Sequence, residues 1–166
     1  MPPDSGLAFV VAAHLDPTQK SLLSELLRRC TKMPVVQIER SIKVEPNQVY
    51  VIAPDQELTI RGGVLHTNKP TAPRGHRHPV DSFFRSLAED QGERAIGIIL
   101  SGTGTNGSPG LRFIKAEGGI VIAQDPEWAG FAGMPRSAIA TGIVDLVVPP
   151  EKMPRRPRPE PQPDLP

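Results

Sequence analysis

The most constraining stretch of the sequence is a pair of apolar runs separated by a glycine-rich loop and a helical segment. Residues 95–100 (AIGIIL) and 120–123 (IVIA) carry no polar side chain, as parallel strands do when both faces of their sheet are covered. Between them, the loop 101–107 (SGTGTNG) leads into a helix that begins at Ser108-Pro109 and ends at Gly118-Gly119. Because a strand, a helix and a second strand in this order form a parallel crossover, we predict an α/β fold.

The remaining segments extend this pattern to a three-layer, doubly wound, mostly parallel sheet. Further strands are expected at 7–13, 35–38, 49–52 and 143–148, and Gly62-Gly63 predicts a small β-hairpin insertion between ELTIR and VLHT. Helices are expected to begin near Asp16-Pro17, at Pro79 and at Pro135. The first of these helices carries an apolar stripe on which Cys30 is expected to pack as a small hydrophobe; the stripe is Leu22, Leu23, Leu26, Leu27 and Cys30.

Length and composition exclude several classes of function. A chain of 166 residues suits one domain, here 1–150, followed by a tail at 151–166 in which prolines alternate with charges, a composition typical of disorder. The net charge of +1 gives no sign of a nucleic-acid partner. No apolar run approaches the roughly 20 residues of a membrane span, so we expect no membrane insertion. The single cysteine is consistent with a reducing cytoplasm.

Three polar segments follow predicted strands directly. They are His14, the loop 101–107 and Gln124-Asp125. Since sites in parallel sheets lie at the carboxyl ends of the strands, we predict that these segments share one rim. From its position alone, His14 is better explained as a hydrogen-bonded structural histidine than as a general base, because a place at a strand end does not establish a base.

Two further patterns have alternative readings. Gly102-x-Gly104-x-x-Gly107 matches the dinucleotide fingerprint, and Asp125 lies near the offset expected of a ribose-binding acid. The three glycines also suit a tight turn between a strand and a helix, so dinucleotide binding stays a third hypothesis. His76-x-His78 offers two imidazoles without a nearby cysteine or acid, which favours a solvated loop over a metal site.

Six segments, taken together and in order, resemble the catalytic domain of the CheB-type receptor methylesterases. The resemblance covers roughly residues 1–150, and these segments are similar in sequence to domains of fused CheB/CheR proteins. The segments are His14-Leu15-x-Pro17 followed by SLLSELL, PNQVYVIAP at 46–54, VDSFFRSLA at 80–88, GIILSGTGTNGSPGLRFIKAEGG at 97–119, AQDP at 123–126 and GMPRSAIATGIVD at 133–145.

This resemblance implies a reaction and its partners. Enzymes of the family hydrolyse glutamate methyl esters on the cytoplasmic helices of methyl-accepting chemoreceptors and release methanol. They use a Ser-His-Asp triad, in which serine attacks, histidine takes its proton and aspartate orients the histidine. The implied location is the cytoplasm, the implied partners are the receptor helices and possible CheR-type methyltransferases, and neither cofactor nor metal is implied.

The match is mixed when it is carried over residue by residue. His14 stands at the family histidine, and Asn106 stands at the family aspartate. The family serine lies in a Gly-x-Ser-x-Gly-Gly loop after a first strand, and this sequence contains neither that loop nor that strand. The rim positions are Ser101, Gly102, Thr103, Gly104, Gly107, Met134 and Pro135.

These departures predict an impaired enzyme. Without the nucleophile no acyl-enzyme can form, and an Asp-to-Asn change in a serine-protease triad costs about 10⁴ in rate. The lack of the first strand also predicts an open edge along strand 7–13. The alternative function is a non-catalytic module that binds receptor helices or a methyltransferase.

Overall fold

The computed structural model describes residues 3–13, 22–70, 73 and 78–153. Four α-helices occur in these ranges: α1 (Leu23–Cys30), α2 (Pro79–Gln91), α3 (Ser108–Ala116) and α4 (Gly133–Ala140). The strands are β1 (Phe9–Val11), β2 (Val35–Ile38), β3 (Ile42–Lys43), β4 (Val49–Ile52), β5 (Glu57–Arg61), β6 (Val64–Asn68), β7 (Ile96–Ile99), β8 (Ile120–Gln124) and β9 (Leu146–Val148). Short 3-10 helices are η1 (Gly92–Arg94), η2 (Pro126–Trp128) and η3 (Pro150–Lys152).

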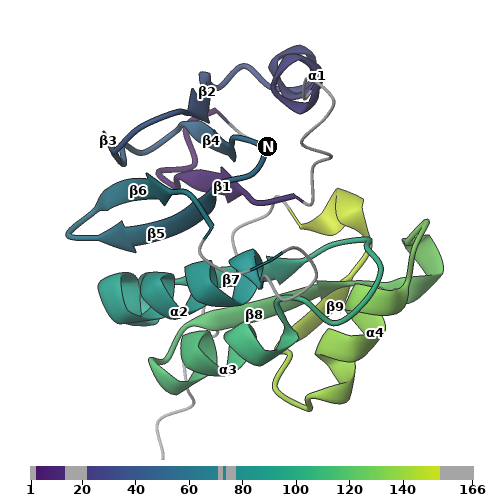
Figure 1. The fold of residues 1–166 in the computed structure, drawn as a ribbon. Coiled ribbons are helices and arrows are strands. Elements are labelled where there is room, and N and C mark those ends of the chain that lie inside the picture. Colours follow the sequence, from purple (N-terminus) through teal and green to yellow (C-terminus); the bar gives the residue numbers. More distant parts are fainter. Residues whose placement is uncertain (1–2, 14–21, 71–72, 74–77, 154–166) are drawn as a thin grey trace, which may run out of the picture.

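The strands form two parallel sheets and one antiparallel sheet, and the helices lie around them (Figure 1). One parallel sheet has the order β1-β4-β2, the other has the order β7-β8-β9, and the hairpin β5–β6 pairs with β3. The register pairs Val10 with Tyr50 in the first sheet and Ile98 with Ile122 in the second. The predicted α/β class and the hairpin insertion are therefore confirmed.

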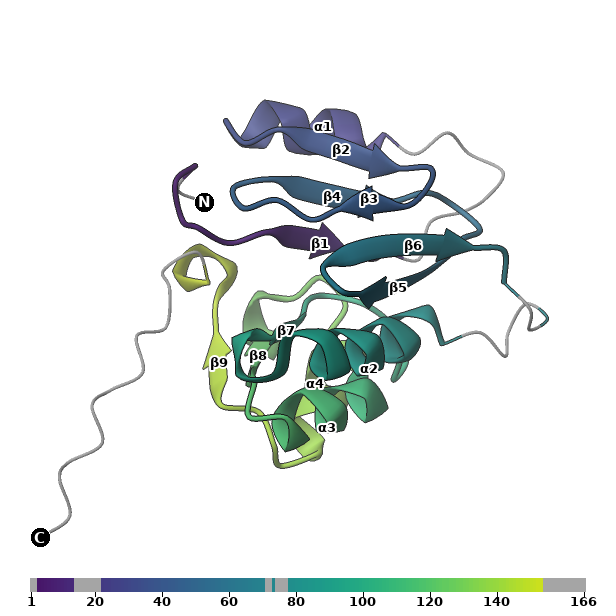
Figure 2. The same cartoon turned by 90° about the vertical axis from the view of Figure 1, so that its left-hand side faces the viewer.

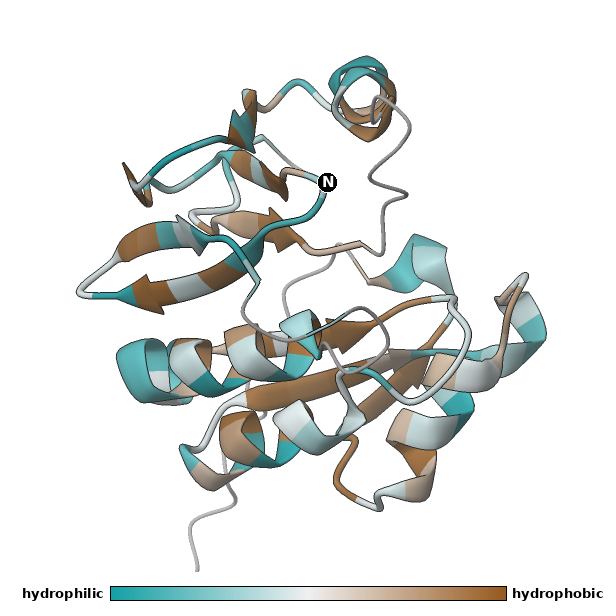
Figure 3. Cartoon of the chain, in the orientation of Figure 1, coloured by the Kyte–Doolittle hydropathy of each residue, from teal (hydrophilic) through white to brown (hydrophobic). Residues whose placement is uncertain are grey.

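The three sheets share one hydrophobic core. Tyr50 on β4 is fully buried, and its hydroxyl accepts a hydrogen bond from the Glu45 N–H at 2.9 Å. Phe83 and Phe84 of α2 and Leu111 of α3 belong to the same cluster. α2 packs against both α3 and β5, so it links the hairpin to the lower sheet (Figure 2). The strands β7 and β8, largely brown in Figure 3, run behind α2 and α3 in this view.

Each parallel sheet has an edge strand that pairs on one side only, as predicted for strand 7–13. Within the described residues, β1 pairs with β4 alone and β7 pairs with β8 alone. The open edge expected along strand 7–13 is thus present. Leu100 follows β7, the edge strand of the other parallel sheet, and leaves half of its surface exposed at the carboxyl end of that strand.

The structure corrects two of the expected elements and adds one. The last strand begins at Leu146 and not at residue 143. The reason is Asp145, whose carboxylate accepts the Val121 N–H at 2.8 Å and pairs with Lys115, which holds residues 143–145 outside the ladder. The last helix begins at Gly133, two residues before the predicted Pro135. The two-residue strand β3 is too short to leave a periodic signal in the sequence.

The helix α1 also buries a narrower face than its apolar stripe predicts. Leu23 and Leu27 pack against the small core of Met33, Val35, Val49 and Val51. Leu22, Leu26 and Cys30 are exposed, so the expectation that Cys30 packs as a hydrophobe is wrong. The physical reason is that α1 meets one small cluster, which covers a single row of its side chains. The predicted helix start at Asp16-Pro17 lies outside the described residues.

The rest of the chain adds two facts. The last described residue is Met153, which directly follows η3. Most of the tail predicted at 151–166 lies outside the described residues. Every helix in the described part of the chain is too short or too polar to cross a membrane.

Asp90 near the end of α2 fastens the turn of the β5–β6 hairpin. One carboxylate oxygen accepts the Gly62 N–H and the other accepts the Gly63 N–H at 3.1 Å. Burial raises the pKa of Asp90, but hydrogen bonds from the Gln91 side chain, Gly63 and Gly62, together with the charge of Arg94, outweigh it, so the pKa lies below its ordinary value. The ionised carboxylate is therefore the form that stabilises the fold.

We expect Asp90→Asn to lower the free energy of unfolding at pH 7, since the amide replaces one acceptor by a donor. Because the pKa of Asp90 is lower in the folded state, the unfolded chain binds more protons as the pH falls. The contribution of Asp90 to the free energy of unfolding is therefore present above about pH 4 and is lost as the pH falls through the pKa of the folded state. Urea unfolding at pH 7, 5 and 3 measures this, with Glu89→Gln as the control on the same helix. A difference between wild type and variant that stays constant down to pH 3 would contradict the assignment.

Candidate functional site

The loop 101–107 lies at the carboxyl end of β7 and turns the chain into α3. Gly107 caps α3 with φ of 92°, a left-handed conformation that suits glycine. A Cβ added there would lie 2.7 Å from Cδ1 of Ile99 and 2.9 Å from Cγ1 of Val80. The turn therefore requires glycine twice over, for its backbone angle and for the close packing of β7 and α2.

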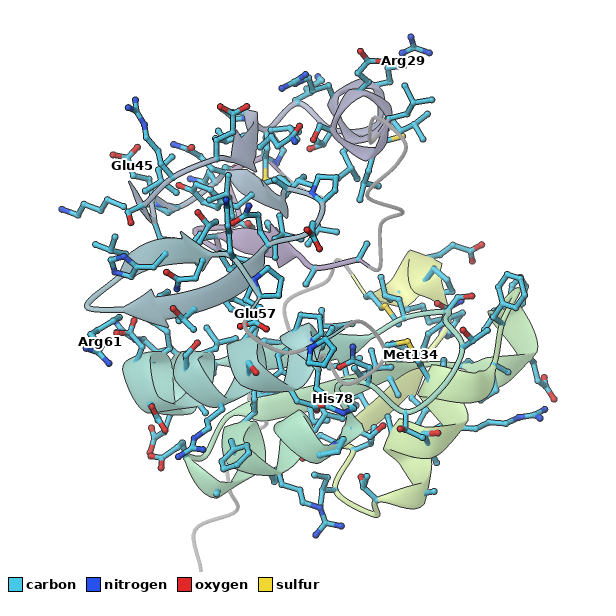
Figure 4. The ribbon with its side chains drawn as sticks, viewed as in Figure 1. Arg29, Glu45, Glu57, Arg61, His78 and Met134 are labelled. Atoms are coloured by element: carbon cyan, nitrogen blue, oxygen red, sulfur yellow. The ribbon has the colours of Figure 1, made fainter. Side chains whose placement is uncertain are left out.

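The start of α4 packs directly on this loop. The Met134 N–H donates to the Gly102 carbonyl at 2.8 Å, and a Cβ on Gly102 would overlap the Met134 sulfur. Met134 projects from the first turn of α4 (Figure 4), and Pro135 beside it is buried. The structure thus brings the predicted rim residues 101–107 and 134–135 together at one edge.

A network of four hydrogen bonds fixes the next loop, residues 125–132, which we name the rim loop. The Gln124 side chain is buried; its Oε1 accepts the Ser101 N–H at 2.9 Å and its Nε2 donates to the Trp128 carbonyl at 2.8 Å. The Phe131 N–H donates to Ser101 Oγ, and the Gly102 N–H donates to the Phe131 carbonyl, each at 2.9 Å. Ser101 therefore has a structural role in this network.

The two predicted catalytic positions have different outcomes. Asn106 is buried within the loop, with 9 % of its surface exposed. Thr103 and Gly104, which precede it, are exposed at the surface of the rim. His14 lies outside the described residues, so its expected place beside Asn106 stays a prediction. Among the described residues, no group of three histidine, cysteine or acidic side chains is placed to hold a metal ion, and His76 lies outside them.

The amino end of α3 already carries an anion of the protein itself. Asp81 of α2 accepts the Gly110 N–H at 2.6 Å through one carboxylate oxygen. Its other oxygen lies 3.8 Å from Nδ1 of His78, so an acid does stand beside this histidine, contrary to the interpretation from the sequence. A carboxylate in this place complements the helix dipole, and it repels the pyrophosphate that a dinucleotide would bring to the same amides. The glycine pattern is therefore better explained as a tight turn.

Sequence reasoning noted Gln124 only as a residue at a strand end and overlooked the clamp that it makes. A polar side chain that ends an otherwise apolar strand was the available signal, because a buried amide must find partners for its donor and its acceptor. Trp128 and Phe131 were overlooked as well, since nothing in a short loop predicts which aromatic side chains stay exposed.

The parallel sheets and the loop-built rim at their carboxyl ends define a class, the α/β domains that carry their site on strand-to-helix turns. The family model described as CheB methylesterase matches residues 1–156. The chain is similar to the crystal structure of the Thermotoga maritima CheB methylesterase catalytic domain, with a TM-score of 0.83 and 30% identity over 93% of this chain and 84% of that one. The chain belongs to the CheB methylesterase family.

Curated relatives show the same likeness. A protein-glutamate methylesterase/protein-glutamine glutaminase of Pyrococcus abyssi is 36% identical over 150 residues, which are 88% of this chain and 41% of the relative. An uncharacterised 104.1 kDa protein of Rhodobacter capsulatus is 44% identical over 126 residues, which are 74% of this chain and 13% of that protein. The chain thus spans less than half the length of these relatives.

Proposed function

We propose that this chain is the catalytic-domain part of a protein-glutamate methylesterase of bacterial chemotaxis. Its substrate would be the glutamate methyl esters on the cytoplasmic helices of chemoreceptors, and its place the cytoplasm. The observation that carries the proposal is the turn 101–107, which is packed on α4 and buries Asn106, the residue that the sequence resemblance matches to the family's aspartate. The match to the family along residues 1–156 supports the same assignment.

The proposed reaction gives each group one task. The serine of the family's Gly-x-Ser-x-Gly-Gly loop, which residues 1–166 do not contain, attacks the ester carbonyl through its oxygen. The imidazole of His14 takes the proton of that serine. The imidazolium then protonates the departing methoxide, which leaves as methanol, and water hydrolyses the acyl-enzyme to restore the glutamate. Asn106 would hold the imidazole by a hydrogen bond without supplying the negative charge of an aspartate.

We further propose that residues 1–166 alone are impaired as an enzyme. No Gly-x-Ser-x-Gly-Gly motif occurs within them, and Asn106 replaces the acid of the triad. The second candidate, a non-catalytic module that binds receptor helices or a CheR-type methyltransferase, is favoured by the exposed aromatic side chains of the rim loop. Dinucleotide binding is disfavoured by the Asp81 carboxylate at the amino end of α3.

The test measures methanol release from methylated receptor by two purified proteins. The first is residues 1–166, and the second is the same chain preceded by the first strand and Gly-x-Ser-x-Gly-Gly loop of the Thermotoga maritima domain. The first is expected to stay at background, because removing the nucleophile of a triad costs about 10⁶ in turnover. The second is expected to release methanol slowly but measurably.

Three controls make the result decisive. The Thermotoga maritima domain sets the family level, a Ser-to-Ala change in the added loop sets the background, and circular dichroism establishes that both proteins are folded. Release by residues 1–166 at the family level would refute the impairment. A folded fusion that stays silent even with Asn106→Asp would refute the methylesterase assignment.

A further inference from the structure

The rim loop presents two aromatic side chains to solvent from a backbone that is held by hydrogen bonds. Trp128 is 59 % exposed and Phe131 is 65 % exposed, although the backbone of both is held by the network around Gln124 and Ser101. Leu100, which is 50 % exposed, precedes Ser101 and so borders the same place. Exposed apolar groups that gather on a fixed surface mark interaction sites, because their burial needs little further ordering.

The other large exposed hydrophobic side chains among the described residues lie elsewhere. Phe113 on α3 has the Arg85 guanidinium over its ring, 5.3 Å from the ring centre. Leu22 and Leu26 belong to α1, and Leu146 and Val147 belong to the edge strand β9. The rim loop is therefore the exposed apolar surface that is hydrogen-bonded to the proposed reaction site.

We propose that Trp128, Phe131 and Leu100 form the docking surface for the protein segment that carries the reacting glutamate. This inference rests on the proposed methylesterase function and names how the same site receives its substrate. A glutamate side chain is short, so the backbone that brings its ester to the loop 101–107 must pass close to this rim. Apolar residues on either side of that glutamate then lie on the rim loop, which Ser101 and Gly102 fasten to the site.

In this arrangement Gln124 is a positioning residue. Its amide bridges the Ser101 N–H and the Trp128 carbonyl, so it sets the distance between the docking surface and the loop that holds Asn106. Pre-organised aromatic anchors of this kind carry a large share of the affinity in protein interfaces. The expected ligand is an amphipathic segment with a glutamyl ester flanked by leucine-sized side chains.

The test uses Trp128, the one tryptophan of the chain, as its reporter. The probe is an alanine-rich helical peptide with a central glutamate γ-methyl ester and leucines on both sides, and serines replace these leucines in a matched peptide. With residues 1–166 we expect the leucine peptide to shift Trp128 emission to shorter wavelength and to protect it from acrylamide. The serine peptide should change neither.

Variants locate the contact by the anisotropy of the labelled peptide. Phe131→Ala and Trp128→Ala are each expected to weaken binding about tenfold, in the range of interface anchors. Phe113→Ala, which removes an exposed ring from another surface, should leave affinity unchanged. Gln124→Met should weaken binding several-fold and also lower the anisotropy of Trp128 without peptide, a change that a purely stabilising role does not require.

Several results would overturn the inference. They are an unchanged affinity in Phe131→Ala, an equal loss in Phe113→Ala, equal binding of the serine peptide, or a Trp128 shift that neutral lipid vesicles reproduce. Binding is measured without turnover, so the two proposals fail separately. Peptide bound through Phe131 with no ester hydrolysis in any fusion would refute the methylesterase assignment alone, whereas full hydrolysis with rim variants of unchanged affinity would refute the docking surface alone.

Discussion

Asn106→Asp is expected to raise methanol release by about four orders of magnitude when the chain also carries the family's nucleophilic serine. The amide of Asn106 can hydrogen-bond an imidazole, but either end of it can face the ring, so the productive tautomer is not selected. A carboxylate accepts the ring N–H and stabilises the imidazolium that forms as the serine loses its proton. The burial of Asn106 strengthens this effect, because charges interact more strongly away from water.

The comparison needs four proteins, with and without the added serine loop and with Asn or Asp at position 106. The gain should occur only where the serine is present. In residues 1–166 alone, Asn106→Asp should give no activity and should lower the melting temperature, since it buries a charge. The reciprocal Asp-to-Asn change in the Thermotoga maritima domain should cost a similar factor. A gain below tenfold in the serine-bearing protein would mean that position 106 does not orient the base.

The order of the elements was predictable where the sequence carries a strong local pattern. The runs that became β4, β7 and β8 are apolar apart from Gln124 at the end of β8. All four residues of β4, four of the five in β8 and two of the four in β7 are buried. Pro79 and Ser108-Pro109 marked the first turns of α2 and α3 at the correct residues. Parallel strands covered on both faces and prolines at helix starts leave signals that need no knowledge of the rest of the fold.

The parts that were missed depend on contacts between residues far apart in the sequence. The start of β9 is set by Asp145 reaching Val121 and Lys115. The anion at α3 comes from Asp81 on another helix, 29 positions away from Gly110. Much of α1 stays exposed because this helix packs against only a small hydrophobic cluster. None of these outcomes follows from local periodicity, because each depends on which neighbour the folded chain supplies.

The candidate site divides in the same way. The glycines of the loop 101–107 could be placed from their spacing, and the structure explains them by backbone angle and close packing. The clamp of Gln124 could not be placed, since a glutamine at a strand end has many possible partners. The proposed docking surface of the rim loop depends on these hydrogen bonds of Gln124, which only the three-dimensional arrangement reveals.

Gly107→Ala is expected to destabilise the fold by about 2–5 kcal/mol, which combines the cost of a strained left-handed backbone with that of overpacking. The backbone part arises from φ of 92°. The packing part arises because the new methyl group would meet the side chains of Ile99 and Val80, which hold β7 and α2 together. A loss of this size is a large fraction of the about 5–15 kcal/mol that stabilises a typical domain.

Gly104→Ala is the matched control, because it separates the two causes. Gly104 has φ of 83°, yet nothing lies within 4 Å of a Cβ added there. Its substitution should therefore cost only the backbone part, about 1–2 kcal/mol. Urea unfolding followed by circular dichroism gives both values. Equal losses at the two positions would show that Ile99 and Val80 do not close on Gly107, and the turn that places Asn106 at the rim would then rest on backbone conformation alone.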